Sequence, residues 1–204
     1  MPAPSKPLRL LIASSNAGKL REYQALVGPS HAGIELALIP HFSAIPLFEE
    51  TAPTFAENAV GKAIHYSNHC EELMIADDSG LLVPALGGAP GVHSARYAGP
   101  EATDADCIRK LLGAMRGMVK NDRRARFVCV LALAKRGQVR AVFSASAEGE
   151  IIEAPRGEHG FGYDPIFLFP TLGKTYAEIS QDEKNRHSHR GKAFQKALEF
   201  LISE

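Results

Sequence analysis

The amino-acid sequence predicts an α/β protein in which helices flank a mixed β-sheet. Short apolar runs alternate with helical patterns in the first part of the chain, which is typical of parallel strands joined by helices. A long apolar hairpin follows and adds antiparallel strands. Because 204 residues suffice for one large core, we expect residues 1–204 to form a single domain. The middle of the chain could form a second lobe, and a cleft between two lobes is a usual place for a small-molecule site.

The first half of the chain contains strands and helices in alternation. Apolar runs bounded by turn signals predict strands at residues 8–14, 34–39 and 73–76. Near-helical spacing of Leu20, Tyr23 and Val27 predicts a helix after the first strand, and the capping box Thr54-x-x-Glu57 predicts the start of another. The third strand is expected to end at Asp77-Asp78-Ser79-Gly80, because two acids are out of place in the packed interior of a sheet.

The second half begins with a loop and ends with a helix. The glycines and the proline at residues 87–91 cannot continue a helix or a strand. Residues 125–134 and 139–147 flank Lys135-Arg136-Gly137-Gln138 and predict a long hairpin. Two further capping boxes, Thr103-x-x-Asp106 and Ser180-x-x-Glu183, open helices. An apolar stripe over residues 193–201 predicts the last helix.

Charge and cysteine content exclude several classes of protein. The 23 basic and 23 acidic residues give a formal net charge of zero. Affinity for phosphate therefore has to come from a local cluster, which favours a small anionic ligand over a nucleic acid. Three cysteines without a CxxC pair indicate buried thiols rather than a zinc site or disulfides. The N-terminal apolar run is too short for a signal peptide or a membrane span, so we expect a cytoplasmic protein with no membrane partner.

The sequence Ser14-Ser15-Asn16-Ala17-Gly18-Lys19 joins the first strand to the first helix. Free N–H groups and the dipole at a helix N-terminus favour an anion, and Lys19 adds a full positive charge. The spacing is not that of a Walker A loop. The turn therefore has two interpretations, a phosphate-binding turn or an ordinary surface loop.

Two pairs of adjacent acids stand out as candidate metal ligands. Asp77 and Asp78 follow a buried strand, and adjacent carboxylates repel each other unless a cation or a donor holds them. Mg²⁺ takes one or two protein carboxylates and completes its shell with water and substrate phosphates, and Glu49-Glu50 is a second source of oxygen ligands. The alternatives are an Asx-type turn for the aspartates and a solvated loop for the glutamates.

Two further segments carry groups that could hold a nucleoside. Phe161-Gly162-Tyr163-Asp164-Pro165 places two aromatics and an acid in one rigid turn, which predicts either a ring face for stacking a base or a β-turn anchored in the core. The basic run from Lys184 to Arg190 precedes the last helix. It is either a solvated face or a place where donors for a base and phosphates gather.

Six segments in order resemble the inosine triphosphate pyrophosphatase family, also called Ham1-like proteins. They read SSNAGKLRE, EETAPTFAENAVGKA, IADDSGL, LGGAPGVHSARYAG, GFGYDPIF and EKNRHSHRGKA, and the similarity extends over nearly the whole chain. The resemblance implies a mixed α/β fold of two lobes around a cleft, a homodimer and Mg²⁺ dependence. It also implies hydrolysis of ITP, dITP and XTP to the monophosphate and pyrophosphate.

The resemblance assigns site residues position by position. It makes Asp78 the catalytic carboxylate and implies that Glu50 and Asp78 hold magnesium, with Asp77 or Glu49 in support. The residues implied to hold the triphosphate are Ser14, Ser15, Asn16, Ala17, Gly18, Lys19 and Lys62. Those implied to surround the nucleoside are Ser79, Phe161, Gly162, Tyr163, Asp164, Lys184, His189 and Arg190. The family usually reads Thr-Gly-Asn where this chain has Ser14-Ser15-Asn16, so a serine restricts the backbone where glycine is usual.

The chemistry of this reaction also fits the residues themselves. Attack on the α-phosphorus needs a water oriented by a carboxylate, a cation on the phosphate oxygens and positive groups for the leaving pyrophosphate. Asp78, Mg²⁺ and the lysines Lys19 and Lys62 fill these roles. Two alternatives remain: a Maf-like pyrophosphatase acting on pyrimidine or modified triphosphates, and a nucleotide- or RNA-binding regulator that lost catalysis. The intact acids and the zero net charge speak against the second.

Overall fold

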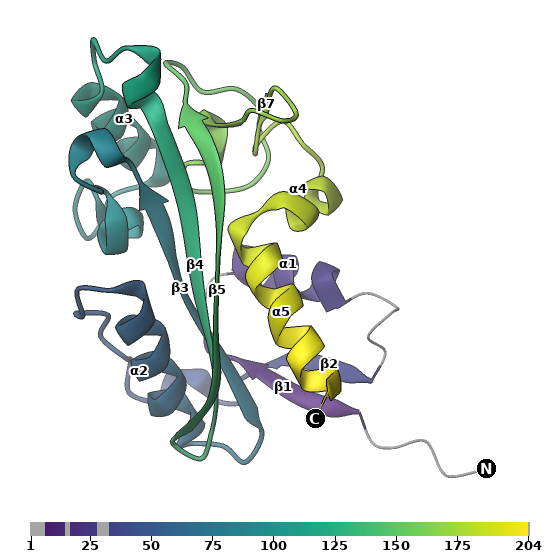
Figure 1. Ribbon diagram of the computed structural model, residues 1–204. Helices are drawn as coiled ribbons and strands as arrows, with labels where there is room; N and C mark the ends of the chain where they lie inside the picture. Colours follow the sequence, from purple (N-terminus) through teal and green to yellow (C-terminus); the bar gives the residue numbers. More distant parts are fainter. Residues whose placement is uncertain (1–6, 15–16, 28–32, 204) are drawn as a thin grey trace. The chain divides into compact units, whose positions relative to one another are not determined.

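The computed structural model describes residues 7–14, 17–27 and 33–203, and in this part of the chain seven strands form one sheet (Figure 1). Their order across the sheet is β2-β1-β3-β4-β5-β6-β7. The strands are β1 Leu8–Ile12, β2 Ile34–Leu38, β3 Leu73–Leu82, β4 Arg124–Lys135, β5 Gln138–Ile151, β6 Phe167–Phe169 and β7 Lys174–Thr175. The α-helices described are α1 Ala17–Val27, α2 Phe55–Ser67, α3 Asp104–Ala114, α4 Gln181–His187 and α5 His189–Ser203.

The sheet is mixed, as predicted. Strand β1 pairs in parallel with β2 and with β3, so that Leu10 lies opposite both Leu36 and Leu73. Strand β6 pairs antiparallel with β5 and with β7. Strands β4 and β5 form the predicted hairpin, and Arg136 and Gly137 at its turn have φ angles of 49° and 74°. Positive φ at both central residues is what a tight hairpin turn with the right twist requires.

Strand β3 is longer than predicted. The prediction that it ends before Asp77 is wrong, because β3 runs from Leu73 to Leu82 straight through the two aspartates. Both aspartates are buried, and each has a partner: Lys19 pairs with the Asp77 carboxylate and Asn58 donates to that of Asp78. These partners form an ion pair or hydrogen bond with each carboxylate. Both side chains can therefore be buried, and the strand continues through them.

Helix starts agree with the capping signals in the sequence. Thr103 and Asp106 form a complete capping box at α3, and Ser180 and Glu183 form one at α4. Thr54 caps α2 by accepting from the backbone N–H of Glu57. Side chains thus satisfy N–H groups at the helix ends that have no partner within the helix, which explains why the starts could be predicted locally.

The chain divides into two compact units. The first unit contains Met1–Asp78, Val130–Ser144 and Ala193–Glu204, and the second contains Ser79–Cys129 and Ala145–Lys192. Strands β3, β4 and β5 each contribute residues to both units.

Each unit has its own apolar core. In the first unit Tyr23 of α1 packs against Phe194 of α5 with ring centroids 4.8 Å apart. In the second unit Phe167 contacts both Phe127 and Tyr176, at centroid distances of 4.6 and 4.9 Å. Of the cysteines, Cys107 and Cys129 are buried as predicted and Cys70 is half-buried, and all of them are free thiols.

Helix α5 covers part of one side of β5 (Figure 1). Strand β5 pairs with the short strand β6 through Glu150 and Ile151. Farther toward the start of β5, the Lys196 ammonium donates to the Ser144 carbonyl at 2.8 Å and the Lys192 ammonium to the Ser146 carbonyl at 3.4 Å. Lysine side chains therefore occupy backbone acceptors along this stretch of β5.

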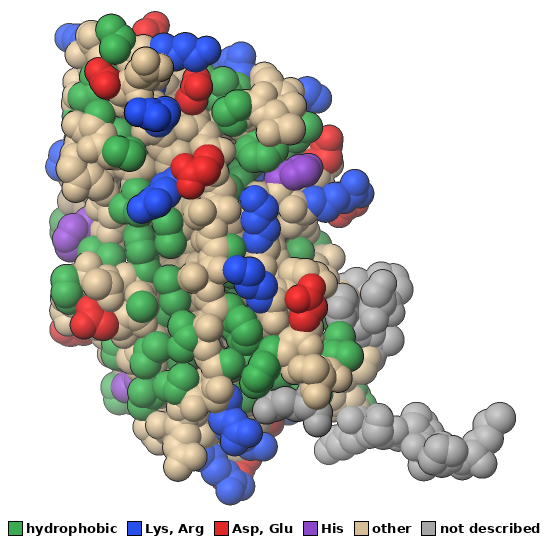
Figure 2. Space-filling model, in the orientation of Figure 1, with side chains coloured by type: hydrophobic (Ala, Val, Ile, Leu, Met, Phe, Trp, Pro, Cys, Tyr) green, Lys and Arg blue, Asp and Glu red, His purple; other side chains and the backbone are tan. Residues whose placement is uncertain are grey.

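Charges of both signs are mixed on one face of the molecule (Figure 2). Asp and Glu side chains lie among the Lys and Arg side chains on the face drawn in Figure 2. This mixture agrees with the formal net charge of zero. None of the helices in the described part of the chain is long and apolar enough to cross a membrane.

Candidate active site

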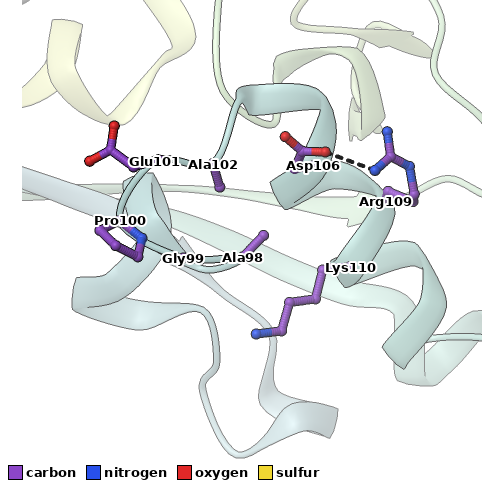
Figure 3. Close-up of a pocket in the computed structure, with 8 residues that line it drawn as sticks. All are labelled: Ala98, Gly99, Pro100, Glu101, Ala102, Asp106, Arg109 and Lys110. Atoms are coloured by element: carbon purple, nitrogen blue, oxygen red, sulfur yellow. Dashed lines mark hydrogen bonds and ion pairs between the residues drawn. The ribbon is translucent and has the colours of Figure 1, made fainter.

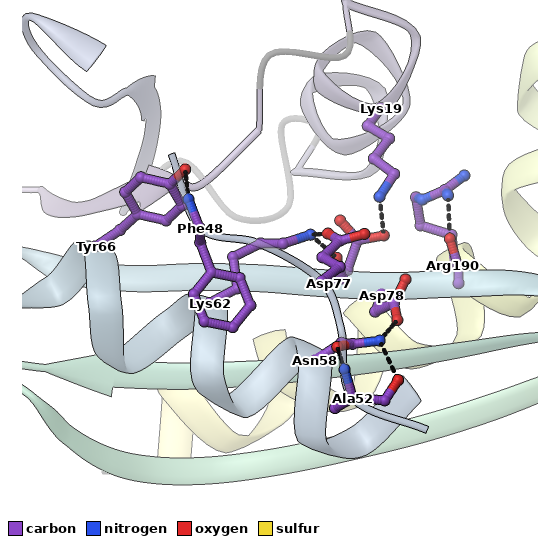
Figure 4. Close-up of polar contacts among 11 residues, drawn as sticks. Lys19, Phe48, Ala52, Asn58, Lys62, Tyr66, Asp77, Asp78 and Arg190 are labelled. Carbon is purple, nitrogen blue, oxygen red and sulfur yellow. Dashed lines mark hydrogen bonds and ion pairs between the residues drawn. The ribbon is translucent and has the colours of Figure 1, made fainter. Parts of the chain in front are cut away.

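The first unit brings the two aspartates of β3 together with donors from α1 and α2 (Figure 4). Asp77 is 2% exposed and Asp78 is 6% exposed. The Lys19 ammonium lies 3.0 Å from Asp77 Oδ2, and the Asn58 side-chain amide donates to Asp78 Oδ2 at 3.0 Å. Each carboxylate is thus bonded to a side chain from a different helix.

Lys62 joins the aspartate strand to the loop that carries Glu50. Its ammonium donates to the Asp77 carbonyl at 3.0 Å and forms an ion pair with the Glu50 carboxylate. Burial lowers the pKa of Lys62, but the charges of Asp77 and Glu50 outweigh this effect, so that its pKa lies above the ordinary value. Lys62 therefore stays cationic although its side chain is mostly buried.

The surroundings of Asp78 disfavour its negative charge. Burial raises its pKa to about 6, and the nearby charge of Glu50 adds to the shift. The Asn58 hydrogen bond and the charges of Lys62 and Lys19 act in the opposite direction. Because the ionised form of Asp78 is disfavoured, a bound cation or a proton near neutral pH would stabilise this side chain.

The carboxylates fit a metal that is completed by its substrate. No group of three or more His, Cys, Asp and Glu side chains gathers around a common point in the described ranges of the chain. Mg²⁺ requires only one or two protein carboxylates when water and substrate phosphates supply the rest. Glu50 and Asp78 repel each other electrostatically, and their carboxylate oxygens are of the kind that Mg²⁺ takes as ligands, whereas Asp77 is engaged by Lys19 and Glu49 is exposed.

The predicted phosphate turn is described only in part. Ser14 is half-buried after β1, and the backbone N–H of the preceding Ala13 donates to the Ile75 carbonyl at 2.9 Å. Ser15 and Asn16 lie outside the described residues. Ala17 and Gly18 open α1, so Lys19 lies in the first turn of a helix, as the sequence predicts.

The second unit orders the aromatic turn that was predicted to hold a base. The Asp164 carboxylate accepts from the backbone N–H of Phe161 at 2.9 Å and pairs with Lys184 at 2.6 Å. The side chains of Asp164 and Lys184 are each only 4% exposed. Asp164 therefore fixes both the turn and the lysine.

Two cations lie against the ring of Phe161. Its centroid is 4.8 Å from the Lys184 ammonium and 5.5 Å from the guanidinium carbon of Arg190. Arg190 also donates to the Ser79 hydroxyl at 2.9 Å. His189 stacks on Phe127 with a centroid distance of 4.7 Å and an interplanar angle of 10°. The second unit therefore presents cationic donors beside an aromatic ring.

Burial bears on the interpretations left open for these two segments. Lys184, His189 and Arg190 are buried, whereas Arg186 between them is exposed, so the basic run is not simply a solvated face. Tyr163 is buried and donates through its hydroxyl to the Ser94 carbonyl at 2.9 Å, while Phe161 is half-buried. The turn thus has one aromatic in the core and one at the surface of the unit.

Three contributing residues were missed in the sequence. Asn58 binds Asp78, Ser94 accepts from Tyr163 and from the backbone N–H of Leu81, and Asp104 accepts from the backbone N–H of Gly162 at 2.6 Å. Asn58 was detectable in principle, because it lies four positions before Lys62 and so on the same side of the predicted helix. Ser94 and Asp104 act through contacts distant in the sequence, for which no local signal exists.

A shallow hollow elsewhere in the second unit contains none of the predicted site residues. It has a volume of about 560 Å³ and lies beside the start of α3 (Figure 3). Among its charged lining residues, Arg109 pairs with Asp106, and Lys110 donates to the Tyr97 carbonyl. Arg109 and Lys110 therefore contact neighbouring residues in and before α3.

Fold and site define an α/β protein with paired carboxylates and lysines, a combination suited to binding a phosphate ester with a divalent cation. The model of the Ham1 family matches residues 10–200. The chain therefore belongs to the Ham1 family.

Relatives within this family resemble the chain over most of its length. A dITP/XTP pyrophosphatase from Geobacillus kaustophilus is 52% identical over 92% of this chain and 91% of the relative. A protein of the same name from Bacillus subtilis is 42% identical over 94% of this chain and 96% of the relative. The solved structure of a HAM1 protein from Coxiella burnetii is 42% identical, with a TM-score of 0.85, and covers 97% of this chain and 100% of that one.

Proposed function

We propose that this chain is a Mg²⁺-dependent nucleoside-triphosphate pyrophosphatase that hydrolyses dITP, ITP and XTP to the monophosphate and pyrophosphate. One observation carries the proposal: in a member of the Ham1 family, Asp78 and Glu50 lie with Lys19 and Lys62 in one compact unit. The dITP/XTP pyrophosphatases from Geobacillus kaustophilus and Bacillus subtilis support the assignment of the substrate.

The residues of the first unit are assigned to the phosphates. Asp78 orients the attacking water and takes up its proton. Lys19 and Lys62 supply positive charge for the pyrophosphate that leaves. Glu50 and Asp78 would hold Mg²⁺, which when bound neutralises charge on the phosphate oxygens.

The residues of the second unit are assigned to the nucleoside. Phe161 offers a ring for stacking a purine, while Lys184, His189 and Arg190 supply donors for the oxygen that replaces an amino group at C6 of hypoxanthine and xanthine. Adenine carries an amino donor at C6, so donors of the base and of the protein would face each other with no acceptor to pair with. A site built on such hydrogen bonds can discriminate by about 10⁴-fold.

The test is a substrate panel with identification of the products. Pyrophosphate release from dITP, ITP, XTP, dATP and dGTP is measured with Mg²⁺ and with EDTA, and phosphorus NMR identifies the products. We expect hydrolysis of dITP and XTP to monophosphate plus pyrophosphate, abolished by EDTA and restored by Mg²⁺. Orthophosphate and a diphosphate as products, or equal turnover of dATP and dITP, would contradict the proposal.

Assembly and location complete the proposal. We propose a homodimer that acts on free nucleotides in the cytoplasm, without nucleic-acid or membrane partners. The mixed surface charge supports a small-molecule substrate. Light scattering of the purified protein gives the oligomeric state directly, and a monomer would contradict this part of the proposal.

A further inference from the structure

Helix α2 carries three polar side chains on one face that hold the loop around Glu50. Asn58, Lys62 and Tyr66 are spaced by four residues each, so they lie in a row along the helix (Figure 4). The Tyr66 hydroxyl accepts from the backbone N–H of Phe48 at 3.2 Å, and Lys62 pairs with Glu50 itself. Asn58 binds the loop on the other side of Glu50, at Ala52.

The Asn58 amide makes hydrogen bonds in two directions. Its oxygen accepts from the Ala52 N–H at 3.0 Å, and its nitrogen donates to the Ala52 carbonyl at 3.2 Å. The same nitrogen donates to Asp78 Oδ2 at 3.0 Å. Its two N–H groups and its oxygen are thus all engaged in one network, and the side chain is 0% exposed.

The orientation of this amide is determined by its neighbours. If the oxygen and the nitrogen exchanged places, an acceptor would face both the Asp78 carboxylate and the Ala52 carbonyl, and the Ala52 N–H would face a donor. A single arrangement therefore satisfies the network. It joins the Asp78 carboxylate to the backbone of Ala52, which lies two residues beyond Glu50.

A neutral amide suits this position better than a cation would. It fixes the direction of the Asp78 carboxylate without neutralising its charge, which stays available to a cation or a proton. A lysine in the same place would compete with a metal for that charge. In this unit the lysine partners described above bind Asp77 and Glu50.

We propose that Asn58 is a positioning residue of the active site: its side-chain amide fixes the Asp78 carboxylate relative to the chain segment that carries Glu50. The inference deepens the proposed function and rests on it. Asn58 touches no substrate atom in this role and acts through the two carboxylates. Loss of the amide lets them separate or rotate, and a displacement of about 1 Å can lower a rate by about 10²-fold.

The test compares the parent protein with Asn58→Ala and Asn58→Asp. Asn58→Asp has nearly the same shape, leaves no cavity and keeps an acceptor for the Ala52 N–H, but it lacks the donors to Asp78 and to the Ala52 carbonyl and adds a negative charge beside Asp78. Ser67→Ala is the matched control, because Ser67 is 0% exposed on the same helix, and its hydroxyl accepts from the Gly137 N–H at 3.0 Å and donates to the Ile64 carbonyl rather than to Asp78. The Asn58 variants and Ser67→Ala therefore each lose a hydrogen bond of a buried side chain.

Kinetics with dITP separate positioning from stability. For both Asn58 variants we expect kcat to fall by about 10- to 10²-fold, with KM changed by less than about threefold and with a higher Mg²⁺ concentration needed for half-maximal rate. Ser67→Ala is expected to lose thermal stability but to keep the parental kcat and Mg²⁺ requirement. Parental kcat in folded Asn58→Asp would overturn the proposal.

A binding measurement without turnover separates this inference from the proposed function. Mg²⁺ together with pyrophosphate should raise the unfolding midpoint of the parent and of Ser67→Ala, and raise it less in both Asn58 variants. Equal shifts in all proteins would overturn the role of Asn58. A parent that releases no pyrophosphate from dITP or XTP would instead overturn the proposed function, while the midpoint shifts still decide the role of Asn58.

Discussion

Glu49 and Glu50 are neighbours in the chain but lie in different surroundings. Glu49 is exposed, whereas the Glu50 carboxylate pairs with the buried Lys62 and acts electrostatically on Asp78. We therefore expect Glu50→Gln to lower kcat for dITP by about 10²-fold or more, because it removes charge from the proposed metal site. Steady-state kinetics over a range of Mg²⁺ concentrations measure this effect.

Glu49→Gln is the matched control for this prediction. The substitution is chemically identical and one residue away, and we expect kcat to stay within about twofold of the parent, because an exposed carboxylate has little influence on a site it does not contact. A larger loss in Glu49→Gln than in Glu50→Gln would reverse the assignment of the two glutamates.

Asp78 makes the stability of the metal-free protein depend on pH. Its pKa in the folded chain is raised from 3.8 to about 6, so folding favours the protonated form. The resulting stabilisation is complete below the ordinary pKa and is lost as the pH rises through about 6. In EDTA at pH 8 we expect Asp78→Asn to raise the free energy of unfolding by up to about 3 kcal/mol, because the amide carries no charge to bury.

Denaturant unfolding at several pH values tests this sign. The advantage of Asp78→Asn over the parent should shrink between pH 8 and pH 4, because at pH 4 the parental carboxyl is protonated in the folded state. The same variant should lose at least about 10²-fold in turnover with Mg²⁺. A variant less stable than the parent at pH 8 would show that the Asp78 charge is stabilising, contrary to its raised pKa.

At the scale of elements, Gly191 allows α4 and α5 to approach closely. A Cβ atom at Gly191 would overlap the backbone carbonyl oxygen of Asn185 in α4. Gly191→Ala therefore forces one of the helices to shift, and we expect it to lower the free energy of unfolding by about 1–3 kcal/mol. Chemical denaturation of the variant and the parent measures this difference.

Gly113 in α3 is the matched control, because a Cβ atom there meets nothing within 4 Å. Alanine is the better helix former, so we expect Gly113→Ala to raise stability by up to about 1 kcal/mol. Opposite signs for the two glycine-to-alanine changes would confirm that close approach, rather than helix propensity, determines the effect at Gly191. A gain in stability from Gly191→Ala would contradict it.

Elements with local signals could be predicted from the sequence, and those that depend on distant partners could not. The caps at Thr103 and Ser180 and the hairpin turn at Gly137 are short-range features, and they lie where the sequence placed them. The extension of β3 through Asp77 depends on Lys19, which comes from another element. Strands β6 and β7 have three and two residues and are too short to produce a periodic pattern.

The site shows the same distinction. The motif resemblance identified Asp78, Glu50 and Lys62, which the structure brings into one network in the first unit. The resemblance did not reveal that Asp164 pairs with Lys184, because the two residues lie in different segments and no sequence pattern indicates that they are in contact. Burial of both turns two surface-type residues into an internal ion pair.

At the scale of the whole molecule, the chain passes repeatedly between the two units. Strands β3, β4 and β5 each have residues in both, so neither unit is a continuous stretch of chain. Unfolding of one unit would break strands that belong also to the other. We therefore expect a single cooperative transition in which both units unfold at the same denaturant concentration.

Single tryptophan reporters test this, because the chain has no tryptophan of its own. Phe42→Trp reports on the first unit and Tyr97→Trp on the second. Each fluorescence transition should coincide with that of the circular dichroism signal of the same variant. Two separate midpoints within one variant would show instead that the units unfold independently.

The lysines of α5 have a consequence for assembly. A strand with open carbonyl and N–H groups along one side is a template on which a strand from another molecule can grow. Here the Ser144 and Ser146 carbonyls of β5 already accept from Lys196 and Lys192, so an incoming strand would have to displace two ammonium groups. Replacing both lysines with alanine would remove these two donors and leave the Ser144 and Ser146 carbonyls available to a strand from another molecule.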